Sequence, residues 1–509
     1  MTGKPWLRVL VAGILLVLPW LVGAPRDAHP ALAPVLWGRY SLLFVVSYLF
    51  HATVIVPWLL ELAFGSTHFS RRWIRRTGYA WFCLALAAGG VEALFRVAPS
   101  LIPNGTLTLL PDLGRSLFRG YFKGQMPDPE LGFRLRPGFT WDEAGHAWLG
   151  DLAAQGIALP TRKEAFSLDL DPPCFNRLDE RGYRGVVDDG VRFSTREERP
   201  RILFLGDSFL FCARLAAEHI WCASACRALG ATAVNLGVFA YGVPQEAIVL
   251  AREIEYYRPQ LVVLCIFDGN DLENGAEWQE WRASGMPYWK WDSRRRGWLE
   301  CSPVLGWAAH RFTVHFGNQD VEALPANPLQ PYRGEIAGAS VVMGFAPAYL
   351  AMLETSPEEA RRHAGWGPTL AGIEQCEALC RQHGARLLVA MLPSKASVYA
   401  WHLLERVDPM AVLEAARGEP LTPERARRFV ERARMYRNGF PAALQAAMEQ
   451  RGRPYLDFRP RFFAEVENGA PQLYRAFDTH WNPAGHQLAA DILVDYLASH
   501  PELLAADRQ

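Results

Sequence analysis

The chain has 509 residues, and its 53 Lys and Arg balance its 53 Asp and Glu, so the formal net charge is zero. This balance, with no long basic run outside one short loop, disfavours a nucleic-acid partner. Half of the residues are hydrophobic, which is enough for a large core and for membrane-spanning helices. The length fits one membrane region followed by one large or two small soluble domains.

The first hundred residues contain three apolar runs without charge. They cover residues 9–24, 41–60 and 77–91, and a membrane-spanning helix needs about 20 such residues. We therefore predict a membrane region at residues 1–98 with about three transmembrane helices. Two alternatives stay open, because the first run also suits a cleaved signal peptide and the third suits a helix in the membrane interface. His51 lies in the second run, where we expect helix packing rather than a functional role.

Basic residues indicate the direction of these helices. Lys4 and Arg8 flank the first run. The loop between the second and third runs contains four arginines: Arg71, Arg72, Arg75 and Arg76. Lys and Arg in short loops stay on the cytoplasmic side. With three spans, both basic regions lie inside, and the rest of the chain lies outside the cytoplasm.

From residue 201 onward, apolar strands alternate with helices. We predict strands at residues 201–205, 233–236, 261–266 and 386–392, and helices near 220–229, 245–257, 369–383, 423–450 and 483–499. Such alternation predicts an α/β fold with a parallel sheet between helices. Residues 99–200 are rich in loops and are expected to wrap the domain at 201–500. Residues 272–366 break the periodicity and are expected to form an insertion, whose many tryptophans either stack on sugar rings or pack a core.

Ser208 is the candidate nucleophile. It follows the strand at 201–205 directly, within Gly206-Asp207-Ser208-Phe209. A serine just past a strand end, with a glycine two residues before it, suits a tight turn that exposes the hydroxyl. The Gly-x-Ser-x-Gly turn of α/β-hydrolases needs a second glycine where Leu210 stands, so that pattern does not apply.

His480 is the candidate base for this serine. A serine hydroxyl needs a base within hydrogen-bond reach, and the base needs an acceptor on its other ring nitrogen. Asp478 lies two residues before His480, and residues i and i+2 of an extended loop point the same way. An Asp-x-His pair also suits metal binding, but no further His or Cys cluster lies nearby at ligand spacing, so we expect neither metal nor cofactor.

Four blocks of the sequence resemble the SGNH (GDSL) hydrolase superfamily, in the order that the superfamily requires. The blocks are Gly206-Asp207-Ser208, the loop from Val234 to Gly242, Gly269-Asn270-Asp271, and Asp478-Thr479-His480. The resemblance spans residues 128–499 and implies a flavodoxin-like sheet in three layers. It assigns the oxyanion donors to the Ser208 N–H, the Ala240 N–H and the Asn270 side chain.

Ala240 departs from this pattern, because the second-block donor is usually a glycine. An alanine still offers an N–H, but it is strained if the loop requires a positive φ. Gly237 and Gly242 therefore remain alternatives for this donor.

The resemblance implies a membrane-tethered serine esterase or O-acyltransferase that acts on acyl esters, with acetyl esters of carbohydrate favoured. The segments at 128–135 and 181–185 look like the lead-in of membrane-anchored bacterial members, and the Asp-x-His-Trp pattern is similar to alginate-type O-acetyltransferases. The expected location is therefore the bacterial inner membrane, with the catalytic domain in the periplasm and a possible membrane partner supplying acyl groups. The alternative is a non-catalytic polysaccharide-binding or export scaffold that keeps the fold.

Overall fold

The computed structural model describes residues 5–22, 34–36, 40–65, 68–97, 124–143, 174–187, 200–212, 215–288, 291, 332–345, 347–404, 422–476 and 478–504. The chain divides into two compact units, one of residues 1–123 and 292–326 and the other of 124–291 and 327–509. Most of the predicted wrapping segment lies outside the described residues, as do Trp289 and Trp298.

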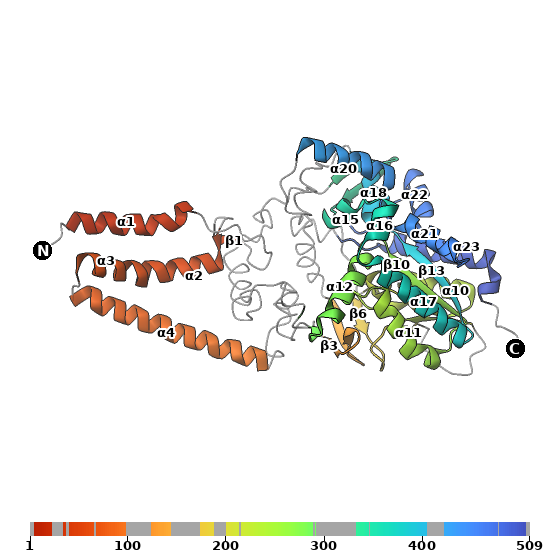
Figure 1. Cartoon of the computed structure of the whole chain (residues 1–509), viewed down its shortest axis with the longest axis horizontal. Helices are drawn as coiled ribbons and strands as arrows, with labels where there is room; N and C mark the ends of the chain where they lie inside the picture. The colour runs from red at the N-terminus through yellow and green to blue at the C-terminus, as the bar shows by residue number, and fades with distance from the viewer. Residues whose placement is uncertain are drawn as a thin grey trace. The chain divides into compact units, whose positions relative to one another are not determined.

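The described residues of the first unit form three helical stretches (Figure 1). They are α1 (Pro5–Val22), then α2 (Leu42–Phe50), η2 (His51–Ile55) and α3 (Val56–Phe64) in succession, then α4 (His68–Val97). Two stretches, Val45–Phe64 and Ser70–Leu94, are long and apolar enough to cross a membrane, and a shorter apolar helix covers Trp6–Val17. The second and third predicted runs therefore lie in helices of membrane-spanning length.

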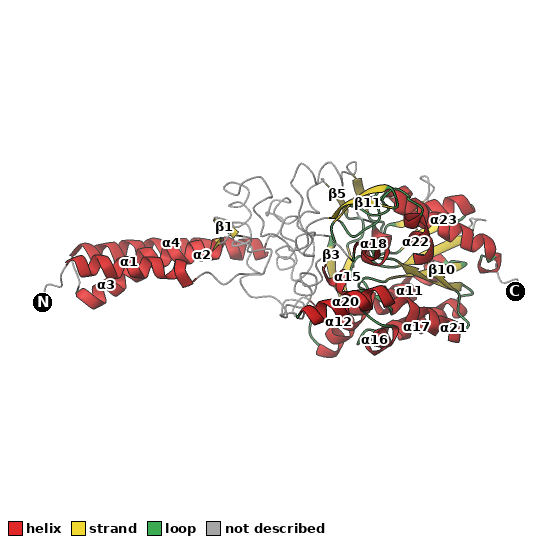
Figure 2. Cartoon of the chain, turned by 90° about the horizontal axis from the view of Figure 1, so that it is seen from above, coloured by secondary structure: helices red, strands yellow, loops and turns green. Residues whose placement is uncertain are grey.

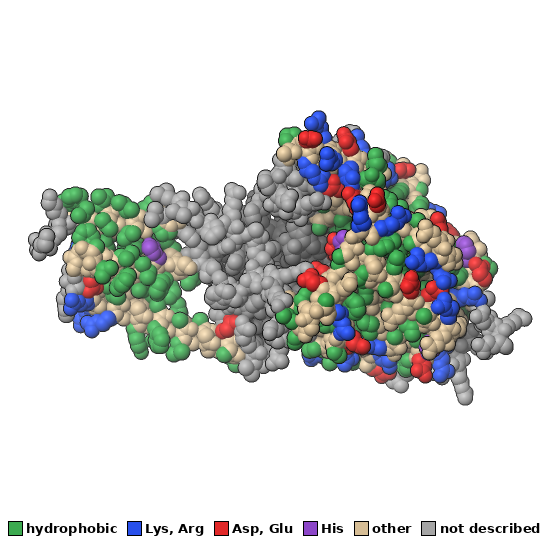
Figure 3. Space-filling model, in the orientation of Figure 1, with side chains coloured by type: hydrophobic (Ala, Val, Ile, Leu, Met, Phe, Trp, Pro, Cys, Tyr) green, Lys and Arg blue, Asp and Glu red, His purple; other side chains and the backbone are tan. Residues whose placement is uncertain are grey.

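Polar groups of these helices bond to each other, while large apolar side chains face outward. His51 Nε2 lies 3.0 Å from the Leu15 carbonyl oxygen, which fits the expected packing role. The Thr53 carbonyl accepts a hydrogen bond from Trp73 Nε1 at 3.1 Å, and the Thr53 hydroxyl accepts one from Trp81 Nε1 at 3.0 Å. Figure 3 shows the apolar exterior of this unit, where Leu62 is 73% exposed. An apolar surface over internal polar contacts is typical of helices that face lipid.

The second unit is built on a six-stranded sheet with the order β14-β13-β10-β8-β9-β7. The strands are β7 (Gly185–Val187), β8 (Arg201–Leu205), β9 (Thr232–Asn235), β10 (Leu261–Phe267), β13 (Arg386–Leu392) and β14 (Tyr455–Asp457). Strands β8, β9, β10, β13 and β14 pair in parallel, and β7 adds an antiparallel edge. When the five parallel strands are numbered along the chain, their spatial order in the sheet is 2-1-3-4-5, the flavodoxin-like arrangement. The predicted α/β class is therefore confirmed.

Helices cover both faces of this sheet. Helices α10 (Trp221–Leu229) and α23 (Pro483–Ser499) pack against each other. Helices α11 (Val243–Tyr257), α17 (Trp366–Gln382) and α21 (Phe440–Gln450) lie on one side in Figure 2, with α23 on the other. The central strands β8 and β10 are buried along their whole length. They are continuous apolar runs because both of their faces are covered.

The predicted helix at 423–450 is wrong in one respect, since the structure has two helices there. Helix α20 (Pro423–Tyr436) ends at Arg437 and Asn438, whose φ values are 45° and 66°. The chain turns there, and Asn438 Nδ2 donates to the Asp268 carbonyl oxygen at 2.7 Å. The break therefore ties α20 and α21 to the loop that follows β10.

The segment predicted to be an aperiodic insertion opens with a regular helix, α12 (Asp271–Ser284). Further along lie a hairpin of β11 (Tyr332–Ile336) and β12 (Ala339–Met343), then α15 (Pro347–Met352) and α16 (Pro357–Arg362). Trp281 and Trp291 are only 4% and 5% exposed. For these two tryptophans, core packing is therefore the better interpretation than sugar stacking.

The other elements connect and flank this framework. A hairpin of β3 (Gln125–Asp128) and β4 (Gly132–Leu135) docks on α11. Arg252 Nη1 donates to Asp128 Oδ2 at 2.7 Å, and Gln245 Nε2 donates to the Leu131 carbonyl oxygen at 2.8 Å. The remaining strands and helices are β1 (Pro34–Leu36), β2 (Tyr40–Ser41), β5 (Thr140–Glu143), β6 (Cys174–Arg177), α9 (Ser208–Phe211), η4 (Ala217–His219), α18 (Lys395–Leu403), α22 (Arg459–Glu467) and η7 (Pro501–Leu503).

Candidate active site

Ser208 is the first residue of α9, which begins three residues after the end of β8. Asp207 caps this short helix, because its Oδ1 accepts a hydrogen bond from the Phe209 N–H at 2.9 Å. Gly206 allows the close turn, since a Cβ there would lie 3.0 Å from the Cys265 Cβ. The half-buried Ser208 side chain is thereby presented at the carboxyl end of the sheet.

Ser208, His480 and Asp478 form one hydrogen-bonded row. The Ser208 Oγ lies 2.9 Å from His480 Nε2, and His480 Nδ1 lies 2.6 Å from Asp478 Oδ1. The same Asp478 oxygen accepts the His480 backbone N–H at 3.0 Å. Because a carboxylate only accepts, Nδ1 carries the proton, and the Nε2 lone pair is left to accept the serine O–H.

Backbone contacts hold the loop that carries His480. Tyr474 pairs with Trp481 in an isolated antiparallel bridge, and the Arg475 N–H donates to the His480 carbonyl oxygen at 3.0 Å. Lys395 Nζ donates to the carbonyl oxygens of Gly344 and Ala476, at 2.8 and 3.2 Å. The buried Lys395 thus ties the end of β12 to the residue two before Asp478.

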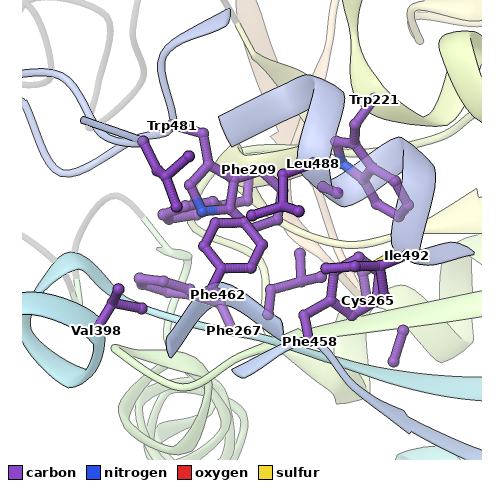
Figure 4. Close-up of a cluster of buried hydrophobic side chains, with 14 of the residues drawn as sticks. Phe209, Trp221, Cys265, Phe267, Val398, Phe458, Phe462, Trp481, Leu488 and Ile492 are labelled. Carbon is purple, nitrogen blue, oxygen red and sulfur yellow. The ribbon is translucent and has the colours of Figure 1, made fainter. Parts of the chain in front are cut away.

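Aromatic rings pack against His480 in this row. The Phe209 ring lies 4.8 Å from the His480 ring and 4.1 Å from the Phe267 ring, measured between centroids. Figure 4 shows Phe209, Phe267 and Trp481 in the buried cluster. Trp481 meets Phe209 edge-on at 5.2 Å and is fully buried. This packing shields one side of the imidazole from water and limits its rotation.

The structure distinguishes Ala240 from the two neighbouring glycines. The Gly237 N–H donates to Asn235 Oδ1 at 2.9 Å, and the Gly242 N–H donates to Gln245 Oε1 at 3.1 Å. Within the described residues, the N–H groups of Ser208 and Ala240 have no acceptor. Ala240 is exposed and adopts a φ of 60°, the left-handed conformation that favours glycine. Of the three second-block residues, Ala240 is therefore the one that offers an uncommitted donor.

Asn270 precedes α12 as its cap residue, but its side chain does not cap the helix. The side chain is half-buried, and its Oδ1 has no donor among the described residues. The turn before it is fixed by Asp268, whose buried Oδ1 accepts the Ser394 N–H at 2.8 Å. The Asn270 amide is thus held at the end of β10, the strand next to β8, without a structural hydrogen bond that occupies it.

Tyr349 on α15 is a further residue at this site that sequence reasoning missed. Its half-buried ring meets the Phe267 ring edge-on at 5.8 Å. Burial, together with the nearby Asp207 and Asp478 carboxylates, raises the pKa of its phenol. No sequence signal marks it, because it lies in the insertion, where the alternation of strand and helix is lost.

His486 has a structural role. Its Nδ1 accepts the Trp221 N–H at 3.4 Å, and burial lowers its pKa to about 3, so the ring stays neutral. In the part of the chain that the structure describes, no group of three or more His, Cys, Asp or Glu side chains is arranged to hold a metal ion.

No protein-family model and no curated protein matches the sequence. Among solved structures, the chain is similar to a catalytic mutant of an acetylxylan esterase from Geobacillus stearothermophilus (12% identity, 58% of this chain and 93% of that chain, TM-score 0.27). It is also similar to a carbohydrate acetylesterase family member from Sinorhizobium meliloti (12%, 59% and 98%, TM-score 0.27) and to the acetyl xylan esterase AlAXEase (11%, 58% and 99%, TM-score 0.26).

The left-handed conformation of Ala240 predicts that glycine is the more stable residue there. An L-residue in this conformation costs about 1–2 kcal/mol, and the extra chain entropy of glycine offsets part of the gain. We expect Ala240→Gly to raise the free energy of unfolding by about 0.5–1 kcal/mol, measured by thermal unfolding of the full chain in detergent. The control is Ala442→Gly at an exposed position of α21, which should lower it by about 1 kcal/mol. A loss of stability in both variants would contradict the strain argument.

Proposed function

We propose that the protein is a serine-dependent esterase or O-acyltransferase. The observation that carries this proposal is the row from Ser208 Oγ to His480 Nε2 and from His480 Nδ1 to Asp478, at 2.9 and 2.6 Å. A nucleophile, a base and a group that orients the base stand in the order that acyl transfer needs. The uncommitted N–H groups of Ser208 and Ala240 add donors for the negative charge that develops on the substrate.

The reaction follows from these positions. His480 Nε2 takes the Ser208 hydroxyl proton as Oγ bonds to the ester carbonyl carbon, and the carbonyl oxygen becomes an oxyanion. Asp478 stabilises the imidazolium, while the Ser208 and Ala240 N–H groups and the Asn270 amide donate to the oxyanion. When the tetrahedral intermediate collapses, the alcohol leaves with the proton from His480, and an acyl-serine remains. Water or a second hydroxyl then attacks with His480 again as base, which gives hydrolysis or transfer.

The proposed substrates are acetyl esters of carbohydrate at the cell envelope. Support comes from the Asp478-Thr479-His480-Trp481 pattern, which is similar to alginate-type O-acetyltransferases, and from the apolar N-terminal helices. A transferase of this kind would receive its acyl group from a membrane partner.

The first functional prediction concerns Ser208 and distinguishes hydrolysis from transfer. We expect Ser208→Ala to lower kcat on an activated acetyl ester by about three orders of magnitude or more, with KM little changed. The full chain in detergent is incubated with the acetyl donor, with and without oligosaccharide, and the products are followed by mass spectrometry. Acetylated oligosaccharide indicates transfer, and free acetate alone indicates hydrolysis. Turnover that survives in Ser208→Ala would exclude Ser208 as nucleophile.

The second functional prediction concerns Asn270. Loss of one preorganised oxyanion donor costs about 10²–10³ in kcat, so Asn270→Ala should lose activity on that scale while its melting temperature stays near that of the wild type. Asn270→Asp should be at least as poor, because a carboxylate repels the oxyanion. Gln279→Ala, at an exposed position of the same helix, is the control and should keep full activity. If Ser208→Ala and Asn270→Ala both leave the cellular phenotype and the activity in vitro unchanged, the non-catalytic scaffold is the better account.

The proposed location predicts a membrane topology. The exposed arginines of α4, namely Arg71, Arg72, Arg75 and Arg76, favour a cytoplasmic position for its first turns. A reporter that is active only outside the cytoplasm should therefore work when fused after Arg96 and fail when fused within residues 70–76. The reverse pattern would place Ser208 in the cytoplasm and end the cell-envelope proposal.

A further inference from the structure

Five carboxyl oxygens lie buried behind the Ser208 and Asn270 turns without a partner among the described residues. One is Asp268 Oδ2, and the other four, from three side chains, are Asp207 Oδ2, Asp271 Oδ1, and both Oε atoms of Glu246. The three side chains are at most 1% exposed. The other oxygen of each aspartate is used, because Asp207 Oδ1 accepts the Phe209 N–H and Asp271 Oδ2 accepts the Phe267 N–H at 2.8 Å. Buried polar atoms without partners are rare and call for a physical explanation.

The three carboxyl groups come together from three different elements. Asp207 directly precedes Ser208 at the end of β8, and Asp271 directly follows Asn270 after the neighbouring strand β10. Glu246 lies in the first turn of α11. That turn packs closely on α12, since a Cβ on Gly242 would lie 3.0 Å from the Gly275 nitrogen. The start of α11 therefore lies against α12, the helix that follows the Asn270 turn, and the Glu246 carboxyl interacts with those of both Asp271 and Asp207.

Three neighbouring carboxyl groups that are buried away from water cannot all be ionised. Burial, then the nearness of Asp271 and Asp207, raises the pKa of Glu246 well above its ordinary value. Burial likewise raises the pKa of Asp271, and that of Asp207 to about 6. The other titratable groups that face the three carboxyls are Cys265 on β10, Cys376 on α17, Cys212 after α9, Tyr349 on α15, Asp268 beside Asp271, and His480 beyond Asp207. Burial raises the pKa of the three thiols and of the phenol, so these groups stay neutral and add no negative charge.

We propose that Glu246 is a positioning residue, a neutral carboxylic acid whose single O–H donates to the Asp207 carboxylate and whose other oxygen accepts the O–H of a protonated Asp271, so that it holds the Ser208 and Asn270 turns at a fixed separation. A protonated carboxyl is the right group for this place, because it donates one hydrogen bond and still accepts another. The expected effect on catalysis rests on the proposed roles of Ser208 and Asn270, whereas the buried hydrogen bond is independent of those roles.

The first test measures the proton itself and needs no activity. Thermal unfolding of the full chain in detergent is followed from pH 5 to pH 8.5 for the wild type and Glu246→Gln, which keeps the size and a donor. The folded wild type retains a proton that an unfolded glutamate releases above a pKa of about 4.3, so its stability falls as the pH rises. Glu246→Gln lacks this contribution, so its melting temperature should rise relative to the wild type across the range.

Glu255→Gln is the matched control, because it makes the same change at an exposed position of the same helix. Its curve should run parallel to that of the wild type. If the Glu246→Gln curve also runs parallel, the folded protein does not hold the extra proton, and the proposal is wrong.

The second test measures positioning. Glu246→Gln should keep kcat within about threefold of the wild type. Glu246→Leu, which has no donor, should lose about 10- to 100-fold in kcat with KM little changed. Small displacements of reacting groups lower the rate on this scale. Full kcat in a folded Glu246→Leu protein would overturn the positioning role. If Glu246→Leu does not fold, the pH comparison with Glu246→Gln still decides. If the wild type shows no Ser208-dependent activity, the proposed function fails, and the unfolding curves still report on Glu246.

Discussion

The parallel pairing of β8 with its neighbours β9 and β10 is the constraint on which the site depends. Ile202 pairs with Ala233 on one side and with Leu261 on the other, so all three strands end at the same edge of the sheet. The turns that follow them carry Ser208, Ala240 and Asn270. Because β8 and β10 are buried along their length, neither strand can slip without moving apolar side chains. The 2-1-3 order also places Ser208 at the switch point, where successive helices leave toward opposite faces and a crevice opens.

The base reaches this edge by a different route. His480 and Asp478 lie on a loop, and no strand aligns them with Ser208. Their position depends on the Tyr474–Trp481 bridge, on the ring of Trp481 in the core, and on Lys395. Since Lys395 also binds the Gly344 carbonyl oxygen, the hairpin of the insertion becomes part of the support of the base. An insertion that looks irregular in the sequence thus has a physical role at the site.

The sequence predicts most of the framework, because apolar runs identify buried strands and motif residues follow them. The three-residue strand β14 was missed because so short a run carries no periodicity. The break between α20 and α21 has a turn signal in Asn438-Gly439, which the long amphipathic pattern outweighed. The choice between Ala240 and its neighbouring glycines needed backbone angles and hydrogen-bond partners. Glu246 and Tyr349 could not be found from the sequence, because only tertiary packing brings them to the site.

The charges around Ser208 must satisfy two opposing requirements. A negative charge near His480 favours the imidazolium that forms when Ser208 gives up its proton, and Asp207 interacts with His480 in this sense. The same negative charge disfavours an oxyanion at the Ser208 and Ala240 N–H groups. Carboxylates on Glu246 and Asp271 would add to this repulsion without lying next to the base. A proton held on Glu246 removes part of that repulsion, while Asp478, hydrogen-bonded at 2.6 Å, still supports the imidazolium. The buried acid can therefore stabilise the turns while limiting the negative charge behind the oxyanion.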